Sequence, residues 1–221
     1  MASVTVENYV KTIWLEQQQT DELIPMGRVA TVMGVTPGTA TTMAKTLNKA
    51  GLIRYEPRDG LRLTAGGEEL AMHVLRRHRL VELFLVQVLG LDWSEVHEEA
   101  EQWEHVISDR VLERMDRILN FPRVDPHGDP IPDASGALPE QDGMCLTEVS
   151  EGKAVAVSRI VDQDPAFLQY LDRVGLTPGT ELEVLGQDRM AEAVTLRVAD
   201  GELVTLGRAA AAKILVTRSG S

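Results

Sequence analysis

The N-terminal third of the chain shows helical periodicity followed by one strand-like stretch. Apolar residues recur at helical spacing over 6–17, and a shorter run of the same kind covers 26–33. Thr36 followed by Pro37 predicts the N-cap and first turn of a third helix, which ends at Gly51. Two short helices joined by a glycine-containing turn are typical of a helix-turn-helix.

Two short β-like runs follow, and the turn sequence from Pro57 to Gly60 separates them. A β-hairpin at this place predicts the wing of a winged helix, where arginines suit phosphate contact. A small helical domain with a solvated hairpin would show the same pattern and remains an alternative. Threonine hydroxyls meet either base edges or phosphates, so the pattern does not specify an operator. The residues predicted to contact DNA are Thr36, Pro37, Gly38, Thr39, Thr41, Thr42, Lys45 and Arg58.

The middle of the chain predicts two long helices, over 66–90 and 94–119. The first has a wide apolar surface that a small domain could not cover by itself, which favours self-association. Helix-turn-helix proteins commonly dimerise to read two half-sites, so this surface is predicted to serve a homodimer. The apolar residues concerned are Leu75, Leu80, Leu83, Phe84 and Val88.

The last part of the chain predicts a β domain behind a linker. Residues 121–143 are rich in Pro, Gly and Asp and lack an apolar period, whereas the residues beyond form short alternating runs with one possible helix at 165–174. A small β-barrel fits this pattern. The expected fold class is therefore mainly α with a β C-terminal domain. The expected segments are a winged helix-turn-helix at 1–64, a helical metal-binding and dimerisation domain at 65–120, the linker at 121–143 and the β domain at 144–221.

The charge distribution changes the interpretation of an acidic chain. The net charge of −12 argues against a general nucleic-acid binder, but residues 1–64 carry 7 basic against 6 acidic side chains. The excess of acidic side chains therefore lies C-terminal to the predicted DNA-binding domain. There it forms either a solubilising surface or a source of oxygen ligands. One cysteine, no apolar membrane-length stretch and no signal-like start predict a cytoplasmic protein.

The residues best suited to bind a metal are histidines and glutamates at helical spacing. His78 and Glu82 lie four residues apart, and so do His97 and Glu101, while Glu104 and His105 follow within one more turn. Imidazole and carboxylate together suit Mn(II), Fe(II), Co(II), Ni(II) or Zn(II), and the lack of thiolate disfavours soft ions. The pattern predicts a divalent-metal site on the middle helices.

Three other interpretations stay open on the residues alone. The cluster has the spacing of a solvated acidic face with helical ion pairs. It would also suit a metal-dependent hydrolase that activates water, although no catalytic motif accompanies it. The β domain is, third, compatible with a peptide-binding module whose ligand would be the proline-rich linker.

These segments together resemble the diphtheria toxin repressor family of iron- and manganese-dependent transcriptional regulators. The stretches RRHRLVELFL, GLDWSEVHEEAEQWEHVISD and PHGDPIP carry the resemblance, which covers the whole chain. It implies a repressor that is not an enzyme. A homodimer loaded with Mn(II) or Fe(II) would bind a palindromic operator through its winged helices and control metal-homeostasis genes, with an SH3-like domain at the C-terminus.

The resemblance also implies two metal sites per chain. The primary site would use Asn8, Glu101, Glu104 and His105. The second would use His78, Glu82 and His97, with contributions from Asp125, His127 and Asp162.

Several positions depart from the family pattern. Glu101 stands where iron-responsive members have cysteine, which favours the manganese-type branch. Asn8 stands where relatives have methionine or aspartate, and Asp125 replaces a cysteine of some relatives. Lys11 stands where one manganese subtype has a ligating glutamate.

Overall fold

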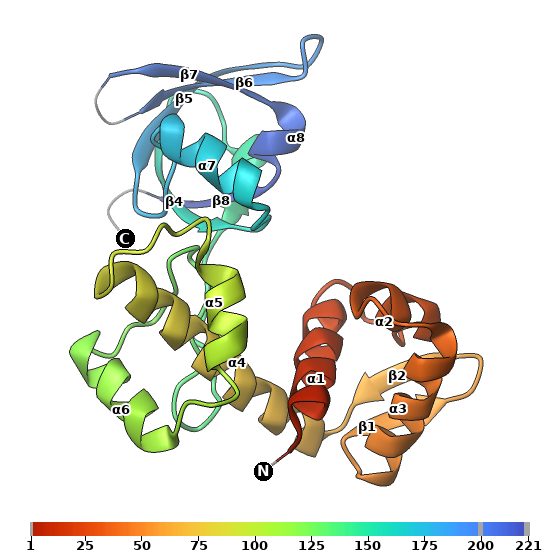
Figure 1. The fold of residues 1–221 in the computed structure, drawn as a ribbon. Helices are drawn as coiled ribbons and strands as arrows, with labels where there is room; N and C mark the ends of the chain where they lie inside the picture. Colours follow the sequence, from red (N-terminus) through yellow and green to blue (C-terminus); the bar gives the residue numbers. More distant parts are fainter. Residues whose placement is uncertain (1, 199–200, 219–221) are drawn as a thin grey trace. The chain divides into compact units, whose positions relative to one another are not determined.

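The computed structural model describes residues 2–198 and 201–218, and Figure 1 labels most of its helices and strands. The chain forms two compact units that are each assembled from separate stretches of sequence. The N-terminal unit comprises residues 1–78, 104–107 and 132–137, and the C-terminal unit comprises residues 79–103, 108–131 and 138–221.

The N-terminal unit contains the predicted winged helix. Three helices precede a two-stranded antiparallel hairpin, and apolar residues from every one of these elements are buried. The elements are α1 (Val4–Gln17), α2 (Met26–Val32), α3 (Pro37–Lys49), β1 (Ile53–Glu56) and β2 (Gly60–Leu63).

Local interactions explain why α3 and the hairpin begin and end where they do. The Thr36 side chain accepts a hydrogen bond from the Thr39 backbone N–H, and Pro37 occupies the first helical turn. Beside the hairpin, the backbones of Ile24 and Leu61 exchange two hydrogen bonds of 2.9 and 3.0 Å. The wing is therefore anchored to the segment that precedes α2.

Helix α4 (Ala65–Gln87) begins in the N-terminal unit and continues into the C-terminal unit after His78. It is the longest helix described. The apolar surface expected to face a partner subunit is largely covered by the chain itself, because Leu75, Leu80 and Leu83 are buried. Among the residues that the structure describes, no helix is both long and apolar enough to cross a membrane.

The predicted single helix over 94–119 is wrong. Two helices occupy this stretch, α5 (Val96–Trp103) and α6 (Asp109–Ile118). The Ser108 side chain accepts a hydrogen bond from the Val111 backbone N–H, so it caps a new helix and separates it from α5. Glu104 and His105 therefore lie in the turn between the helices instead of on a helical face.

The β domain of the C-terminal unit contains one six-stranded sheet with the order β3-β8-β4-β5-β6-β7. Its strands are β3 (Met144–Cys145), β4 (Lys153–Ile160), β5 (Glu181–Asp188), β6 (Ala193–Val198), β7 (Leu203–Gly207) and β8 (Ile214–Arg218). The 3₁₀ turn Leu146–Glu148, α7 (Pro165–Arg173) and α8 (Arg208–Ala211) complete it. Alternate strand residues fill a core that also receives Trp93.

The fold class is confirmed as mainly helical with a β C-terminal domain, but the sheet is not closed into a barrel. Strands β3 and β7 are the two edge strands of the sheet, and no pairing joins them in the part of the chain that the structure describes. The two-residue length of β3 gives a physical reason, because so short a strand offers few hydrogen bonds for closure.

Candidate metal centre and nucleic-acid face

The predicted DNA-contact residues lie together on the winged helix. Six of the seven on α3 and its cap are exposed, and Thr41 is partly buried. The Thr41 and Thr42 hydroxyls donate to backbone carbonyls one turn earlier. Arg58 is exposed at the tip of the hairpin with φ +81°. This side of α3 and the wing tip form an accessible polar surface.

Glu104 is the centre of a buried polar cluster in the N-terminal unit. Its side chain is fully buried, and each carboxylate oxygen has a partner: Lys11 Nζ lies 2.7 Å from Oε1, and His78 Nδ1 lies 2.6 Å from Oε2. Lys11 comes from α1 and His78 from α4. The turn after α5 is therefore joined to two helices of this unit through one carboxylate.

The environment of Glu104 keeps it ionised. Burial raises the pKa of this carboxyl, but the hydrogen bond and charge of His78, together with Lys11, outweigh burial and hold the pKa below its usual value. A buried carboxylate that keeps its charge is suited to bind a cation.

Glu7 determines which nitrogen of His105 is available. His105 Nδ1 lies 2.7 Å from Glu7 Oε2, and because a carboxylate only accepts, Nδ1 carries the hydrogen. In the neutral ring, Nε2 then holds a lone pair. This nitrogen is buried without a hydrogen bond, although it lies 3.2 Å from Glu104 Oε1. Two acceptor atoms face each other there, and a cation between them would relieve their repulsion.

Asn8 adds a further orphaned oxygen in this unit. Its Oδ1 is buried and has no hydrogen-bond partner. Buried amide oxygens are rarely left unpaired, so this atom is a candidate ligand. Two potential ligand atoms of the N-terminal unit, Asn8 Oδ1 and His105 Nε2, are thus buried and unpaired. These residues therefore fit a divalent ion.

A second candidate centre lies wholly within the C-terminal unit. Glu82, Asp125 and His127 each offer a ligand atom, and the three atoms lie within 4.8 Å of one another. All three side chains are buried. Glu82 comes from α4, and the other two come from the proline-rich segment before the β domain.

The ring of His127 is oriented for coordination through Nδ1. Its Nε2 lies 2.8 Å from the backbone carbonyl oxygen of Trp93, which only accepts, so Nε2 carries the hydrogen. Nδ1 then holds a lone pair and is buried without a hydrogen bond, 3.9 Å from oxygens of both Glu82 and Asp125. Hydrogen bonding of the second ring nitrogen is the usual way to orient a metal-binding imidazole.

Negative charge accumulates around Asp125. Burial raises the pKa of this carboxyl well above its usual value, and the charges of Asp129 and Glu82 raise it further, while Arg79 opposes them. Asp125 Oδ2 also lacks a hydrogen-bond partner. A bound cation would compensate both features, so this cluster also fits a divalent ion.

The segment that carries Asp125 and His127 is held against β4. One Asp125 oxygen accepts from the backbone N–H groups of His127 and Asp129 at 2.8 and 2.9 Å. The His127 carbonyl accepts from Ile160 N–H at 2.8 Å. Gly128 has φ +89°, and a Cβ there would overlap the Ser158 carbonyl oxygen, so only glycine permits this approach.

The other predicted ligands have different surroundings. His97 is 53% exposed, with Nδ1 3.3 Å from Glu82 and Nε2 3.7 Å from Glu101. Asp162 pairs with Lys213 at 2.5 Å, and the hydrogen bond from that lysine holds the pKa of Asp162 below its usual range. Asp162 is thus not among the clustered carboxylates of this unit.

Four functional features escaped the sequence reasoning. Glu7, the carbonyl of Trp93 and Asp129 orient or surround the candidate ligands, and Lys11 bonds directly to one of them. Trp93 and Asp129 lie in stretches that carry the family resemblance, and Lys11 departs from the family pattern, but helical spacing indicates none of these contacts. For Glu7 the available signal was its position beside Asn8 in the chain.

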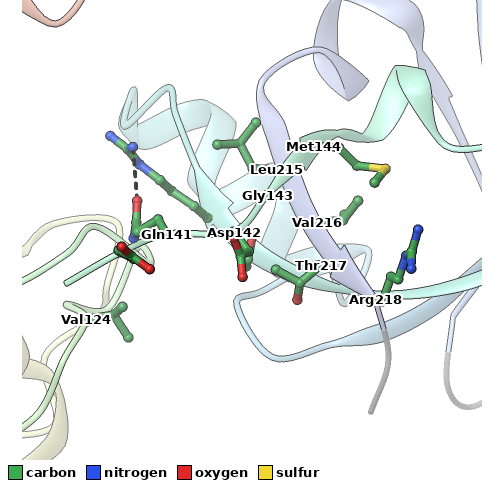
Figure 2. A pocket seen from close by; sticks show the side chains of 12 residues that line it. Val124, Gln141, Asp142, Gly143, Met144, Leu215, Val216, Thr217 and Arg218 are labelled. Carbon is green, nitrogen blue, oxygen red and sulfur yellow. Dashed lines mark hydrogen bonds between the residues drawn. The ribbon is translucent and has the colours of Figure 1, made fainter. Parts of the chain in front are cut away.

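A surface groove of about 760 Å³ lies beside β8 in the C-terminal unit (Figure 2). Residues 140–144 and 215–218 line it, together with Val124, Ser158 and Arg159. None of Glu82, Asp125 and His127 lines it. The groove therefore does not supply the substrate cleft that a metal-dependent hydrolase would require at this cluster.

Three family models match successive parts of the chain. They are the iron dependent repressor N-terminal DNA binding domain over residues 1–61, the iron dependent repressor metal binding and dimerisation domain over residues 64–133, and the FeoA domain over residues 144–218.

Curated relatives and solved structures agree with these matches. The iron-dependent repressor IdeR of Mycobacterium tuberculosis (strain H37Rv) is 34% identical over 91% of this chain and 92% of its own length. The diphtheria toxin repressor of Corynebacterium diphtheriae is 31% identical over 83% of this chain and 85% of its own. A solved manganese-dependent transcriptional repressor in complex with manganese is 38% identical, with a TM-score of 0.86 and coverage of 96% of this chain and 99% of that one.

The winged helix and the buried ligand clusters define the class as a metal-dependent, DNA-binding transcriptional regulator. The chain belongs to the iron-dependent repressor family, which includes IdeR and the diphtheria toxin repressor. The resemblance noted in the sequence is confirmed, and the manganese-dependent neighbour fits the manganese-type branch. The hydrolase alternative has no support among these relatives.

Proposed function

We propose that this protein is a repressor that binds a palindromic operator as a homodimer when loaded with Mn(II) or Fe(II), and that it controls genes of metal homeostasis. One observation carries the proposal: the ligand atoms Asn8 Oδ1, His105 Nε2, Asp125 Oδ2 and His127 Nδ1 are buried without hydrogen-bond partners. Burying such atoms costs free energy unless a bound ion interacts with them.

The proposed primary site contains Asn8, Glu104 and His105, to which the family resemblance adds Glu101. The bound ion supplies a double positive charge to a set of nitrogen and oxygen ligands. A set without thiolate suits Mn(II) or Fe(II), and the similar structure that carries manganese supports Mn(II).

The proposed second site contains Glu82, Asp125 and His127. Their shared burial and the raised pKa of Asp125 support this assignment. His78, His97 and Asp162 remain predictions for the same site on the family resemblance alone. Asp162 would first have to leave Lys213.

The connection to DNA runs through α1. Asn8 lies on α1, which packs against the wing strand β2, and Glu104 and His105 lie in the 104–107 segment of the same unit. An ion bound by all three would hold the winged helix in one arrangement relative to that segment. If only this arrangement fits both operator half-sites, metal binding and operator binding support each other thermodynamically.

The remaining assignments complete the proposal. We assign DNA contact to the exposed residues of α3 and the wing tip, and dimerisation to residues 65–120, with 1–64, 121–143 and 144–221 as the other functional segments. Regulation of genomic DNA would place the protein in the cytoplasm. Relatives that are transcriptional repressors support a regulator without enzymatic activity.

A mobility-shift experiment tests the proposed function. DNA bound by the protein would first be selected from a random pool with Mn(II) present. Affinity for that DNA would then be measured with Mn(II) and with chelator. Tight binding only with metal is expected, whereas equal affinity in both conditions would contradict the proposal.

Three variants add specificity to that experiment. Glu104→Ala and His105→Ala should lose the metal-dependent shift, because each removes a primary ligand. Glu99→Ala is the matched control, since Glu99 is an exposed glutamate of α5 outside both candidate sites. It should behave as the parent protein does.

A further inference from the structure

Lys11 is a cation already bound to the main ligand of the primary site. Its Nζ lies 2.7 Å from Glu104 Oε1, and the two side chains are only 8% and 0% exposed. The other Glu104 oxygen is bonded by His78. In this state the carboxylate has positive or hydrogen-donating groups at both oxygens.

The oxygen held by Lys11 is also the one that faces His105. His105 Nε2 lies 3.2 Å from Glu104 Oε1. Because Glu7 accepts the hydrogen of His105 Nδ1, the free lone pair of the neutral ring is on Nε2. An ion that binds His105 Nε2 and Glu104 Oε1 together would have to approach the atom that the Lys11 ammonium contacts.

Charge makes simultaneous occupancy unfavourable. A divalent ion and an ammonium on one carboxylate oxygen repel each other over a few ångströms, and burial reduces the screening of that repulsion. The lysine chain has the flexibility to withdraw, because its ammonium is carried on a four-carbon stem.

We propose that Lys11 competes with the metal at the primary site: its ammonium neutralises Glu104 in the metal-free protein and must leave Oε1 before a divalent ion binds there. Lys11 thereby raises the metal concentration at which the repressor loads. This inference rests on the proposed function, since it requires Glu104 and His105 to be metal ligands.

The competition also explains how Glu104 is tolerated when no metal is bound. A fully buried carboxylate without a counter-ion would destabilise the fold. Lys11 removes that cost in the metal-free protein, so the site is kept formed in both states. Replacing Lys11 by an uncharged side chain should therefore weaken the metal-free fold and strengthen metal binding together.

The test measures Mn(II) affinity by electron paramagnetic resonance of the free ion, in a background of Asp125→Asn that weakens the second site. Lys11→Met should bind Mn(II) about tenfold or more tightly than the parent, because the competing charge is gone. Lys11→Arg keeps the charge and should not bind more tightly than the parent. Lys153→Met removes an exposed lysine of the β domain and controls for net charge.

Thermal melting provides a second, independent measurement. Lys11→Met should melt at a lower temperature than the parent without metal, and Mn(II) should raise its melting temperature by more. If the metal-free variant does not fold, the Mn(II) concentration that restores folding replaces the melting shift, and Lys11→Gln repeats the comparison with a polar side chain.

The outcomes separate this inference from the proposed function. Equal or weaker Mn(II) binding by Lys11→Met, or equal tightening by Lys153→Met, overturns the competition while leaving metal-dependent repression intact. A parent protein that binds operator DNA equally with Mn(II) and with chelator contradicts the proposed function instead. Tighter binding confined to Lys11→Met and Lys11→Gln supports the competition.

Discussion

His105 and Glu7 form a hydrogen bond of 2.7 Å between Nδ1 and Oε2, which joins the turn after α5 to the first helix. The bond leaves Nε2 of His105 as the nitrogen with a free lone pair. A carboxylate in this position also makes the imidazole a better donor to a metal. Glu7 is thus a positioning residue beside Asn8, although no spacing in the sequence marks it.

The variant Glu7→Gln should weaken Mn(II) binding at the primary site by about tenfold to a hundredfold. An amide supports the ring less well, and it permits the opposite tautomer by donating to Nδ1. Equilibrium dialysis would measure the effect. Glu22→Gln, at an exposed residue before α2, controls for the loss of one charge; similar affinity in both variants would exclude this role of Glu7.

The variant Gly128→Ala should lower the free energy of unfolding by roughly 3 kcal/mol, because the new Cβ would overlap the Ser158 carbonyl and force the loop from β4. The second metal site should weaken as well, since Asp125 and His127 lie on this loop. Urea denaturation and metal titration would measure the two effects. Gly179→Ala is the matched control, because Gly179 has φ +92° and a Cβ added there would meet no atom within 4 Å.

The variant Lys45→Ala should weaken binding to operator and unrelated DNA to similar extents. Lys45 is exposed on α3 and suits a phosphate contact, which carries no sequence information. The slope of log affinity against log salt should fall by about one unit. Fluorescence anisotropy at several salt concentrations would measure it, with Lys153→Ala as the control. An unchanged slope would remove Lys45 from the interface.

The variant Leu89→Glu should weaken the homodimer. Val88, Leu89 and Leu91 are 46%, 51% and 36% exposed just beyond α4, an apolar group that a partner subunit would cover. Sedimentation equilibrium should show a raised dimer dissociation constant, and operator affinity should fall with it. Met190→Glu changes an isolated exposed residue of the β domain. Dimers of equal strength in both variants would place the interface elsewhere.

The fold class and the winged helix were predictable because their signals are local. Thr36 and Pro37 begin α3 through a cap and a fixed dihedral angle, and the turn before Gly60 forms the hairpin. Alternating apolar residues likewise predicted the strands of the β domain. The sheet's lack of closure was not predictable in this way, because pairing of its first and last strands depends on contacts distant in sequence.

The candidate metal site was likewise predictable only in part. The residue types of the metal clusters, histidine and carboxylate without thiolate, were determined by the sequence, and so was their concentration between the winged helix and the β domain. The helical face assumed for Glu104 and His105 does not exist, because Ser108 caps a new helix and leaves both residues in a turn.

The sequence by itself determined the class of protein, the types of ligand it offers a metal and the order of the elements in the winged helix. Only the tertiary structure decided that Lys11 bonds Glu104, that Glu7 directs His105, and that the Trp93 carbonyl orients His127. The physical reason is distance along the chain. Helical spacing constrains residues within a few turns, whereas these partners are 93, 98 and 34 positions apart and meet only when the chain packs.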